Sequence, residues 1–465
     1  MVYAQIKEKR KKYNISQTKL SLISGYSKTQ ISAWELNKTK PSNTQLKKME
    51  MVLDKTIFNI NNGLDDIRKK HITTSQKKSR KRIPEIINTP EEYIEKFSQN
   101  QQNNNDYSKL LKKMYKKAFS KRGKNAPKAI ALFSGCGGFS LGFAAEGFDI
   151  IGHVEIEKSA NRIYESNFKN SILLGEDICN ISNDDIESWK EEFGNIDVII
   201  GGPPCQGYSL AGKRDPEDMR NQLYKYYVNI VSILRPKVFV FENVRLLTSM
   251  KTRDGYLFID LITDAFEKVG YKLIRKEINA ANYGVPQSRE RVVIVGIHKK
   301  INKSFVFPQE EYAEDNQRTF RDATFDLQNL ESGEKSSDPL HWSVSHPKHV
   351  INWLKDVPEG CSAHENEDLS KRPPSGFNTT YKRIKWDEPC STISTNFSMI
   401  SGSRNVHPIS TRALTIREAT RVQSFPDEFV FCGNWGDIRK SIGNAVPPLL
   451  AQEIAKEVYL QIFAD

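Results

Sequence analysis

The sequence predicts an α/β protein that has a mostly parallel sheet with helices on both faces, a smaller second domain, and an all-α domain at the N-terminus. From Lys128 onward, short β-branched runs alternate with helical stretches, as in parallel strands joined by crossover helices. That rhythm is absent before Lys128 and is lost again between His298 and about Arg412. The expected strands are Ala129–Phe133, Ile150–Val154, Ile196–Ile200, Val238–Phe241, Leu273–Ile278 and Arg291–Ile297.

Length and charge also indicate several domains. The chain has 465 residues, more than one hydrophobic core usually serves. Its 69 Lys+Arg and 57 Asp+Glu give a net charge of +12, which favours a polyanionic partner. The excess is uneven, because residues 1–128 carry 30 Lys+Arg and 11 Asp+Glu, which leaves residues 129–465 net acidic. The basic character therefore belongs to the N-terminal part.

Membrane and secreted proteins are excluded by the same sequence. No stretch approaches the ~18 consecutive apolar residues of a membrane span, and no apolar segment of a signal peptide follows the charged Met1–Lys12. We therefore expect a cytoplasmic protein that does not contact a membrane. The six cysteines lack Cys-x-x-Cys spacing. His341, His346 and His349 are expected to be scattered surface histidines, so no metal site is expected.

Residues 14–53 are expected to form short helices joined by tight turns. Ser27-Lys28-Thr29-Gln30 has the Ser-x-x-Gln form of a capping box, so a helix should begin at Lys28. Ile31 and Trp34 are spaced on it to pack inward. The residues on its other faces, where a recognition helix contacts bases, are Lys28, Thr29, Ser32 and Ala33.

A series of residues in this region resembles the helix-turn-helix of phage-repressor-like transcription regulators. The series is Ser16-Gln17, Leu20, Gly25, Ile31-Ser32-x-Trp34-Glu35, Pro41-Ser42 and Leu46. The resemblance implies a DNA-binding domain. A small helical bundle for protein contacts is the alternative.

A glycine-rich turn follows the first expected strand, at Phe133-Ser134-Gly135-Cys136-Gly137-Gly138. Such a turn alone fits a phosphate, a nucleotide or no ligand. Glu155, at the end of the second strand, is placed to accept hydrogen bonds from ribose hydroxyls, and Asp177 is placed for an adenine amino group. An adenosine-containing cofactor without an obligatory pyrophosphate fits, although either acid alone is more often a helix cap or a surface charge.

Four reactive side chains are expected to meet at one edge of the sheet. Cys205 follows a strand and Pro203-Pro204, a position that suits a nucleophile. Glu242 ends the neighbouring strand. Arg289 and Arg291 enter another strand two residues apart, so both side chains should point to the same face.

Six motifs in order resemble those of DNA (cytosine-5) methyltransferases, from about Ala129 to Ala451. They are Phe133-x-Gly135-x-Gly137-Gly138, Pro203-Pro204-Cys205-Gln206, Glu242-Asn243-Val244, Gln287-x-Arg289-x-Arg291, Arg417-Glu418-Ala419-x-Arg421-x-Gln423-Ser424-Phe425-Pro426, and Gly443-Asn444-Ala445-Val446-Pro447-Pro448. The resemblance implies the S-adenosylmethionine-dependent methyltransferase sheet. It also implies a cofactor site formed by Phe133, Gly135, Gly137, Gly138, Glu155, Asp177, Ile178, Leu223 and Asn444.

The resemblance implies a role for each reactive side chain. Cys205 would add to carbon 6 of cytosine, Glu242 would hold ring nitrogen 3 and the exocyclic amine, Arg291 would contact the base O2, and Arg289 would help to position the thiolate and the neighbouring backbone. The target base would have to be flipped out of the duplex, with Gln206–Leu223 as a mobile loop that closes over it. The chain departs from the family pattern at Ala131, where an acid is common, and at Ile156, where an aromatic is common.

The expected domains follow from these motifs and from composition. They are a helix-turn-helix domain at 1–60, a basic and polar linker at 61–125, a catalytic and cofactor-binding domain at 126–300, a target-recognition domain at 301–412, and C-terminal motifs that return to the catalytic domain at 413–465. The linker is interpreted equally well as a solvated tail or as an arm that contacts phosphates.

The charge of the expected target-recognition domain is divided. Residues 301–370 carry 6 Lys+Arg and 14 Asp+Glu, whereas residues 371–412 carry 7 and 2. Because acidic surface avoids phosphates, we place the DNA contacts in the second stretch, with Arg383 and Arg404 as candidates. Simple solvation of these charges is the alternative.

The leading hypothesis is a DNA (cytosine-5) methyltransferase of a bacterial restriction-modification system, whose N-terminal domain also represses a promoter. Its partners would be S-adenosylmethionine, double-stranded target DNA and an operator, and the methyltransferase part would be monomeric. Two alternatives are a transcription regulator with an inactive methylase-like domain and an RNA cytosine-5 methyltransferase. Intact Cys205, Glu242, Arg289 and Arg291 oppose the first, and the long recognition region together with the DNA-type reader opposes the second.

Overall fold

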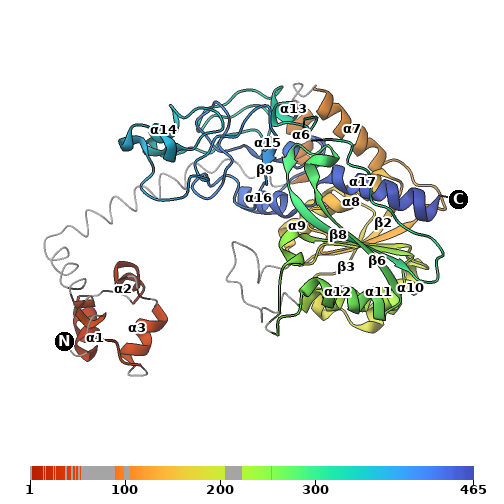
Figure 1. Ribbon diagram of the computed structural model, residues 1–465, viewed down its shortest axis with the longest axis horizontal. Coiled ribbons are helices and arrows are strands. Elements are labelled where there is room, and N and C mark those ends of the chain that lie inside the picture. The colour runs from red at the N-terminus through yellow and green to blue at the C-terminus, as the bar shows by residue number, and fades with distance from the viewer. Residues whose placement is uncertain are drawn as a thin grey trace. The chain divides into compact units, whose positions relative to one another are not determined.

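The protein is described by a computed structural model that divides into two units, Met1–Glu85 and Ile86–Asp465 (Figure 1). The structure describes residues 3–13, 15, 17–24, 26, 28–36, 39–42, 45–47, 49–50, 53, 89–98, 105–204, 222–252, 254–313 and 315–464. Within these ranges, no helix is both long enough and apolar enough to cross a membrane.

The first unit contains the helices α1 (Tyr3–Lys12), α2 (Gln17–Ser24) and α3 (Lys28–Glu35). Ile31 and Trp34 are buried, as the sequence predicts, in a core that also contains Ile6, Ile15, Leu20, Met49 and Leu53. Arg10 of α1 forms an ion pair with Glu35 of α3 at 2.7 Å. Of the residues expected to face DNA, Ser32 and Ala33 are half-buried, and the side chains of Lys28 and Thr29 lie outside the described residues.

The second unit is built on a seven-stranded sheet in the order β3-β2-β1-β4-β5-β8-β6. The strands are β1 (Lys128–Leu132), β2 (Asp149–Val154), β3 (Ile172–Gly175), β4 (Val198–Gly201), β5 (Val238–Val244), β6 (Tyr271–Asn279) and β8 (Glu290–His298). β8 pairs antiparallel with both β5 and β6, and the other pairs are parallel. The predicted mostly parallel sheet is confirmed.

Helices cover both faces of this sheet (Figure 1). Alternate residues of β1 enter separate cores, because successive side chains of a strand point to opposite faces: Ala129 and Ala131 join one core, and Ile130 and Leu132 join the other. The first core contains α8 (Gly138–Ala145) and α17 (Pro448–Val458). The second contains α10 (Asn183–Phe193), α11 (Leu223–Leu234) and α12 (Phe258–Lys268). α9 (Lys158–Asn167) follows β2.

The expected linker at 61–125 is wrong for its C-terminal half. Residues 90–118 include two helices, α6 (Pro90–Ser98) and α7 (Asp106–Ala118), which belong to the second unit. Tyr107, Leu111, Met114 and Ala118 of α7 are buried in the core that contains α8. Their spacing of three or four residues is a helical signal that the many lysines between them obscure.

Buried ion pairs fix these helices to the C-terminal segment. Arg417 and Arg421 of α15 (Ile416–Val422) are fully buried, and Arg417 donates to the Tyr93 hydroxyl of α6 at 3.0 Å. Tyr107 of α7 donates to the carbonyl of Arg421 at 3.0 Å. Asp427 pairs with both arginines, at 3.2 Å and 2.7 Å. α6 and α7 are therefore part of the folded second unit.

The region at 301–412 has little regular structure. It contains α13 (Phe320–Thr324), α14 (Lys348–Leu354) and β9 (Cys390–Ser391), which pairs with β7 (Gln287–Ser288). A small core of its own includes Leu354, Ala363 and Val406. The chain then returns through α15, α16 (Trp435–Asn444) and α17, and α17 packs against α8.

We expect Leu111→Ala to destabilise the second unit by about 2–5 kcal/mol, because it leaves a cavity in the core that α7 shares with α8. Lys113→Ala, on the exposed face of α7, is the matched control and should have little effect. The measurement is urea unfolding followed by the fluorescence of the second unit. An unchanged midpoint for Leu111→Ala would show that α7 is not part of the cooperative core.

Candidate functional site

The glycine-rich turn after β1 approaches the C-terminal segment closely. Gly135 and Gly137 have φ of 56° and 100°, left-handed values that favour glycine. Gly137 precedes the first residue of α8. A Cβ on Gly138 would lie 2.3 Å from the carbonyl oxygen of Val446. Small residues are therefore required in the turn, because its backbone lies directly against the backbone of the C-terminal segment.

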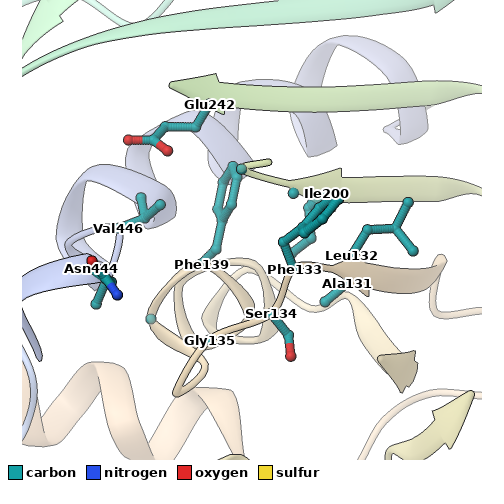
Figure 2. Close-up of a pocket in the computed structure, with 14 residues that line it drawn as sticks. Ala131, Leu132, Phe133, Ser134, Gly135, Phe139, Ile200, Glu242, Asn444 and Val446 are labelled. Atoms are coloured by element: carbon teal, nitrogen blue, oxygen red, sulfur yellow. The ribbon is translucent and has the colours of Figure 1, made fainter. Parts of the chain in front are cut away.

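A pocket with an empty volume of about 400 Å³ lies at this meeting point. Figure 2 shows Glu242 facing it from β5, with Asn444 and Val446 on one side and Leu132 and Phe133 on the other. Its lining residues are Ala131, Leu132, Phe133, Ser134, Gly135, Gly138, Phe139, Ile200, Gly201, Gly202, Glu242, Asn444, Ala445 and Val446. Residues far apart in the chain thus form one site.

The structure brings together part of the expected cofactor set. Phe133, Gly135, Gly138 and Asn444 line the pocket. Gly137 does not line the pocket, although it lies in the chain between Gly135 and Gly138; a Cβ there would meet the Phe168 ring at 2.6 Å. Residues that the sequence reasoning missed include Phe139, Gly202 and Val446. The sequence could have indicated these three residues, because they lie inside or next to the motifs quoted above.

Glu155 holds the glycine turn against the end of β2. Its carboxylate accepts hydrogen bonds from the backbone N–H groups of Gly135 at 2.7 Å and Glu157 at 2.8 Å. Burial raises the pKa of Glu155, and these two N–H groups act in the opposite direction. A carboxylate has about four acceptor positions, so Glu155 keeps capacity for a ligand hydroxyl.

The expected adenine-side residues lie outside this pocket. Asp177 accepts the backbone N–H of Cys179 at 2.9 Å and begins the short helix η1 (Ile178–Asn180). Ile178 is buried, and Leu223, the first residue of α11, is partly buried against the same core. η1 contacts α11, and Ile178 and Leu223 belong to the same core. Whether they form one cofactor site with the pocket stays a prediction.

Glu242 and Arg291 form a nearly buried ion pair, with the Arg291 Nε 2.9 Å from the Glu242 Oε1. Val244 and Arg291 are register partners in the antiparallel pair of β5 and β8, which sets this approach. Burial lowers the pKa of Arg291, and the Glu242 carboxylate opposes that shift. A Cβ on Gly202 would lie 2.8 Å from the Glu242 Oε2, so the backbone of Gly202 lies next to this carboxylate without a side chain between them.

Cys205 lies outside the described residues, as does most of the expected loop Gln206–Leu223. The chain leading to it is fixed, because the Asn243 side chain donates to the carbonyl of Pro203 at 2.8 Å. β4 and β5 are parallel neighbours, so Pro203 and Glu242 lie at the same edge of the sheet.

Arg289 contacts backbone from two distant segments. Its guanidinium donates to the carbonyls of Ile393 at 3.2 Å, Gly443 at 3.1 Å and Ala445 at 3.0 Å. Burial lowers the pKa of Arg289, as does the nearby Arg291 charge. The observed partners of Arg289 are therefore the pocket wall at Gly443–Ala445 and the segment at Ile393.

The expectation that Arg383 contacts DNA is wrong for this structure. Arg383 is only 2% exposed, and its guanidinium donates to the carbonyls of Leu354, Val357, His407 and Ser410. It organises the small core of the 301–412 region instead. Arg404 is exposed and stays a candidate.

The expected surface histidines are not all at the surface. His341 is 1% exposed and bonds to the Gln328 carbonyl at 2.7 Å, and half-buried His346 accepts the N–H of Ala413 at 3.0 Å. His349 is exposed. Among the described residues, no cluster of His, Cys, Asp or Glu could hold a metal ion.

The sheet has seven strands, with one antiparallel strand near its edge. A glycine turn follows β1, and a buried acid follows β2. These features define a methyltransferase-type fold. The C-5 cytosine-specific DNA methylase family matches residues 127–460, and a helix-turn-helix family matches residues 6–58. The chain belongs to the C-5 cytosine-specific DNA methylase family and is a DNA (cytosine-5) methyltransferase.

Individual relatives agree with this assignment. The chain is 40% identical over 335 residues to the Type II methyltransferase M1.HphI of Haemophilus parahaemolyticus, covering 71% of this chain and 86% of the relative. It is 34% identical over 370 residues to the Type II methyltransferase M.DdeI of Desulfomicrobium norvegicum, covering 71% and 88%. A solved structure of a putative DNA modification methyltransferase encoded within a prophage (E. coli) has a TM-score of 0.56 at 25% identity and covers 72% of this chain and 99% of its own.

The residues present fit the S-adenosylmethionine that this family and fold imply. The position of a Cβ on Gly135 has nothing within 4 Å, so a ligand can approach the backbone of the turn there, and Glu155 keeps acceptor positions for hydroxyls. Ser134, on the lining of the pocket, has a buried hydroxyl without a partner among the described residues.

We expect Gly138→Ala to weaken S-adenosylmethionine binding roughly ten-fold or more, because relieving a 2.3 Å contact with the Val446 carbonyl displaces the pocket wall at a cost of about 1–3 kcal/mol. Gly123→Ala is the matched control, since a Cβ there meets nothing within 4 Å. Isothermal titration calorimetry measures both affinities. Equal affinities would contradict the assignment of this pocket.

Proposed function

We propose that this methyltransferase methylates carbon 5 of a flipped cytosine in a specific duplex DNA site, through a covalent adduct at Cys205. The observation that supports this most directly is the Glu242–Arg291 pair, with its carboxylate on the lining of the cofactor pocket. The acid that we propose to hold the base would therefore lie next to the region that would hold the methyl donor. The relatives are Type II methyltransferases, so we assign the chain to a restriction-modification system.

Carbon 5 of cytosine is a weak nucleophile, and the protein has to activate it. In the proposed mechanism the Cys205 thiolate adds to carbon 6, which makes carbon 5 enamine-like. Glu242 holds ring nitrogen 3 and the exocyclic amine, and favours protonation at nitrogen 3 as the adduct forms. S-adenosylmethionine supplies the methyl group that carbon 5 accepts. Loss of the carbon 5 proton and expulsion of Cys205 then restore the aromatic ring.

Arg291 has two roles in this proposal. Its guanidinium holds the Glu242 carboxylate at 2.9 Å, which fixes the acid before the base arrives. Its remaining N–H groups are available for the base O2. Arg289, through the carbonyls of Gly443 and Ala445, keeps the facing wall of the pocket in place.

DNA is favoured over RNA as the substrate by the family match and by the named DNA-modifying relatives. An inactive methylase-like regulator is disfavoured because Glu242, Arg289 and Arg291 are all present and two of them pair in the site. We infer a monomeric methyltransferase unit.

We expect bisulfite sequencing of DNA from cells that express the protein to find 5-methylcytosine at one recurring sequence. Cys205→Ala should abolish it completely, while duplex DNA binding survives, because the thiol forms a bond to the base and contributes little to docking. Glu242→Gln should lower turnover by about 10²–10⁴-fold. Methyl transfer by Cys205→Ala would exclude the covalent mechanism, and absence of 5-methylcytosine with the wild type would favour the regulator.

A second function is supported by the helix-turn-helix match at residues 6–58 and by the packing of α3. We propose that this unit binds an operator and represses a promoter. Its recognition residues would be Lys28, Thr29, Ser32 and Ala33 of α3.

DNase footprinting of the upstream promoter tests that role with the full chain. We expect Lys28→Glu to abolish protection of the operator, because a carboxylate there repels phosphates, and to leave in vitro methylation unchanged. Lys47→Glu, the same charge reversal at an exposed residue outside α3, is the control. Protection that survives Lys28→Glu would argue against α3 as the recognition helix.

A further inference from the structure

Arg439 of α16 has fewer partners than Arg383, Arg412, Arg417 and Arg421, which are fully buried. Arg412, Arg417 and Arg421 each pair with a carboxylate at 2.6–2.8 Å. Arg383 is satisfied by several carbonyl oxygens. Arg439, by contrast, has one hydrogen bond among the described residues, from Nη1 to the Ser398 hydroxyl at 2.9 Å.

The guanidinium of Arg439 is nevertheless held in a defined place. It lies 5.1 Å from the centre of the Trp435 ring, one helical turn earlier on α16. Trp435 in turn contacts Trp342 at 5.5 Å and Phe397 at 6.5 Å between ring centres. Burial lowers the pKa of Arg439. A cation that is partly withdrawn from water without a counter-ion is costly, so an anionic ligand would be bound favourably here.

The donors in this cluster outnumber the acceptors. The Nε of Arg439 and the indole N–H of Trp435 are buried without a partner in the part of the chain that the structure describes. The Ser398 hydroxyl accepts from Arg439 and therefore keeps its own proton to donate. The Nη2 of Arg439 is the second arm of a planar fork, which suits the paired oxygens of a phosphate.

The cluster lies where the recognition region meets the cofactor pocket. Trp435, Arg439 and Gly443 are four residues apart and share one face of α16. A Cβ on Gly443 would lie 2.4 Å from the backbone nitrogen of Thr395, so this face runs along the segment that leads to Ser398. The next residue, Asn444, lines the pocket.

We propose that Arg439, together with Ser398, binds a backbone phosphate of the substrate DNA near the target base. The inference rests on the proposed function, because it takes the ligand of this junction to be duplex DNA. The sequence predicts Arg383 as a phosphate contact, and this proposal assigns that role to Arg439 instead. The contact would position the duplex relative to α16, and through α16 relative to Asn444.

The test measures duplex DNA binding by the full chain at several salt concentrations, with Arg439→Gln and Arg439→Lys. We expect Arg439→Gln to weaken binding about ten-fold at low salt and to reduce the slope of log K against log salt by about one. Arg439→Lys, which keeps the charge, should keep the slope. All variants retain the N-terminal unit, so any DNA binding by that unit is the same in each variant and does not contribute to the differences between them.

Lys440→Gln is the matched control. It removes the same charge from the next position of α16, where Lys440 pairs with Glu157 at 2.8 Å. We expect no change in its salt slope. An unchanged slope for Arg439→Gln, or an equal loss in Lys440→Gln, would overturn the proposal. A parallel loss of S-adenosylmethionine affinity in Arg439→Gln would also overturn it, since the role would then be structural.

A second experiment locates the phosphate. Once the methylated site is known, neutral methylphosphonate linkages are placed one at a time around the target cytosine. One of them should weaken the wild type and have no further effect on Arg439→Gln; additive losses at every position would contradict the contact. Failure of the proposed function is distinguishable, because it appears as absence of methyl transfer by the wild type, whereas this test measures binding alone.

Discussion

The buried ion pairs of α15 are the interaction on which the rest of the enzyme depends. Arg417 and Arg421 have no exposed surface and join Asp338, Asp326 and Asp427, which lie in three separate parts of the chain. Removing one partner of such a pair typically costs about 3–5 kcal/mol, because the other charge stays buried. The arrangement fixes where the C-terminal segment returns, and that segment supplies Asn444 and Val446 to the pocket.

The reversed direction of β8 has a direct chemical effect. The carboxyl ends of β1, β4 and β5 meet at one edge of the sheet, where Phe133, Pro203 and Glu242 lie. Because β8 runs the opposite way, its beginning is at that same edge, and Arg291 arrives beside Glu242. A parallel β8 would have placed Arg291 at the far edge. One antiparallel strand thus supplies cations to a site otherwise built from strand ends.

The sequence predicts the sheet and the closeness of Glu242 and Arg291 well, for a physical reason. Continuous apolar runs such as Ala129–Leu132, which are buried on both faces of the sheet, leave a clear pattern, and Glu242 and Arg291 belong to short local motifs. Long-range burial leaves no such pattern. Arg383 has the composition of a DNA contact but is surrounded by carbonyls, and α7 is obscured by lysines around Tyr107 and Leu111. Counts of charged residues do not distinguish an arginine in solvent from a buried arginine that stabilises the domain that contains it.

The backbone contact between Gly443 and Thr395 limits how such enzymes can exchange specificity. Ile393, Ser394 and Thr395 lie against the cofactor wall and against Arg289, so this stretch belongs mechanically to the catalytic body although it is continuous with the recognition region. In the proposed function, a recognition region transplanted from a relative would join the chain on the N-terminal side of Cys390 and again beyond Thr395. Chimaeras that replace the stretch itself would displace the pocket wall that Arg289 and Gly443 hold.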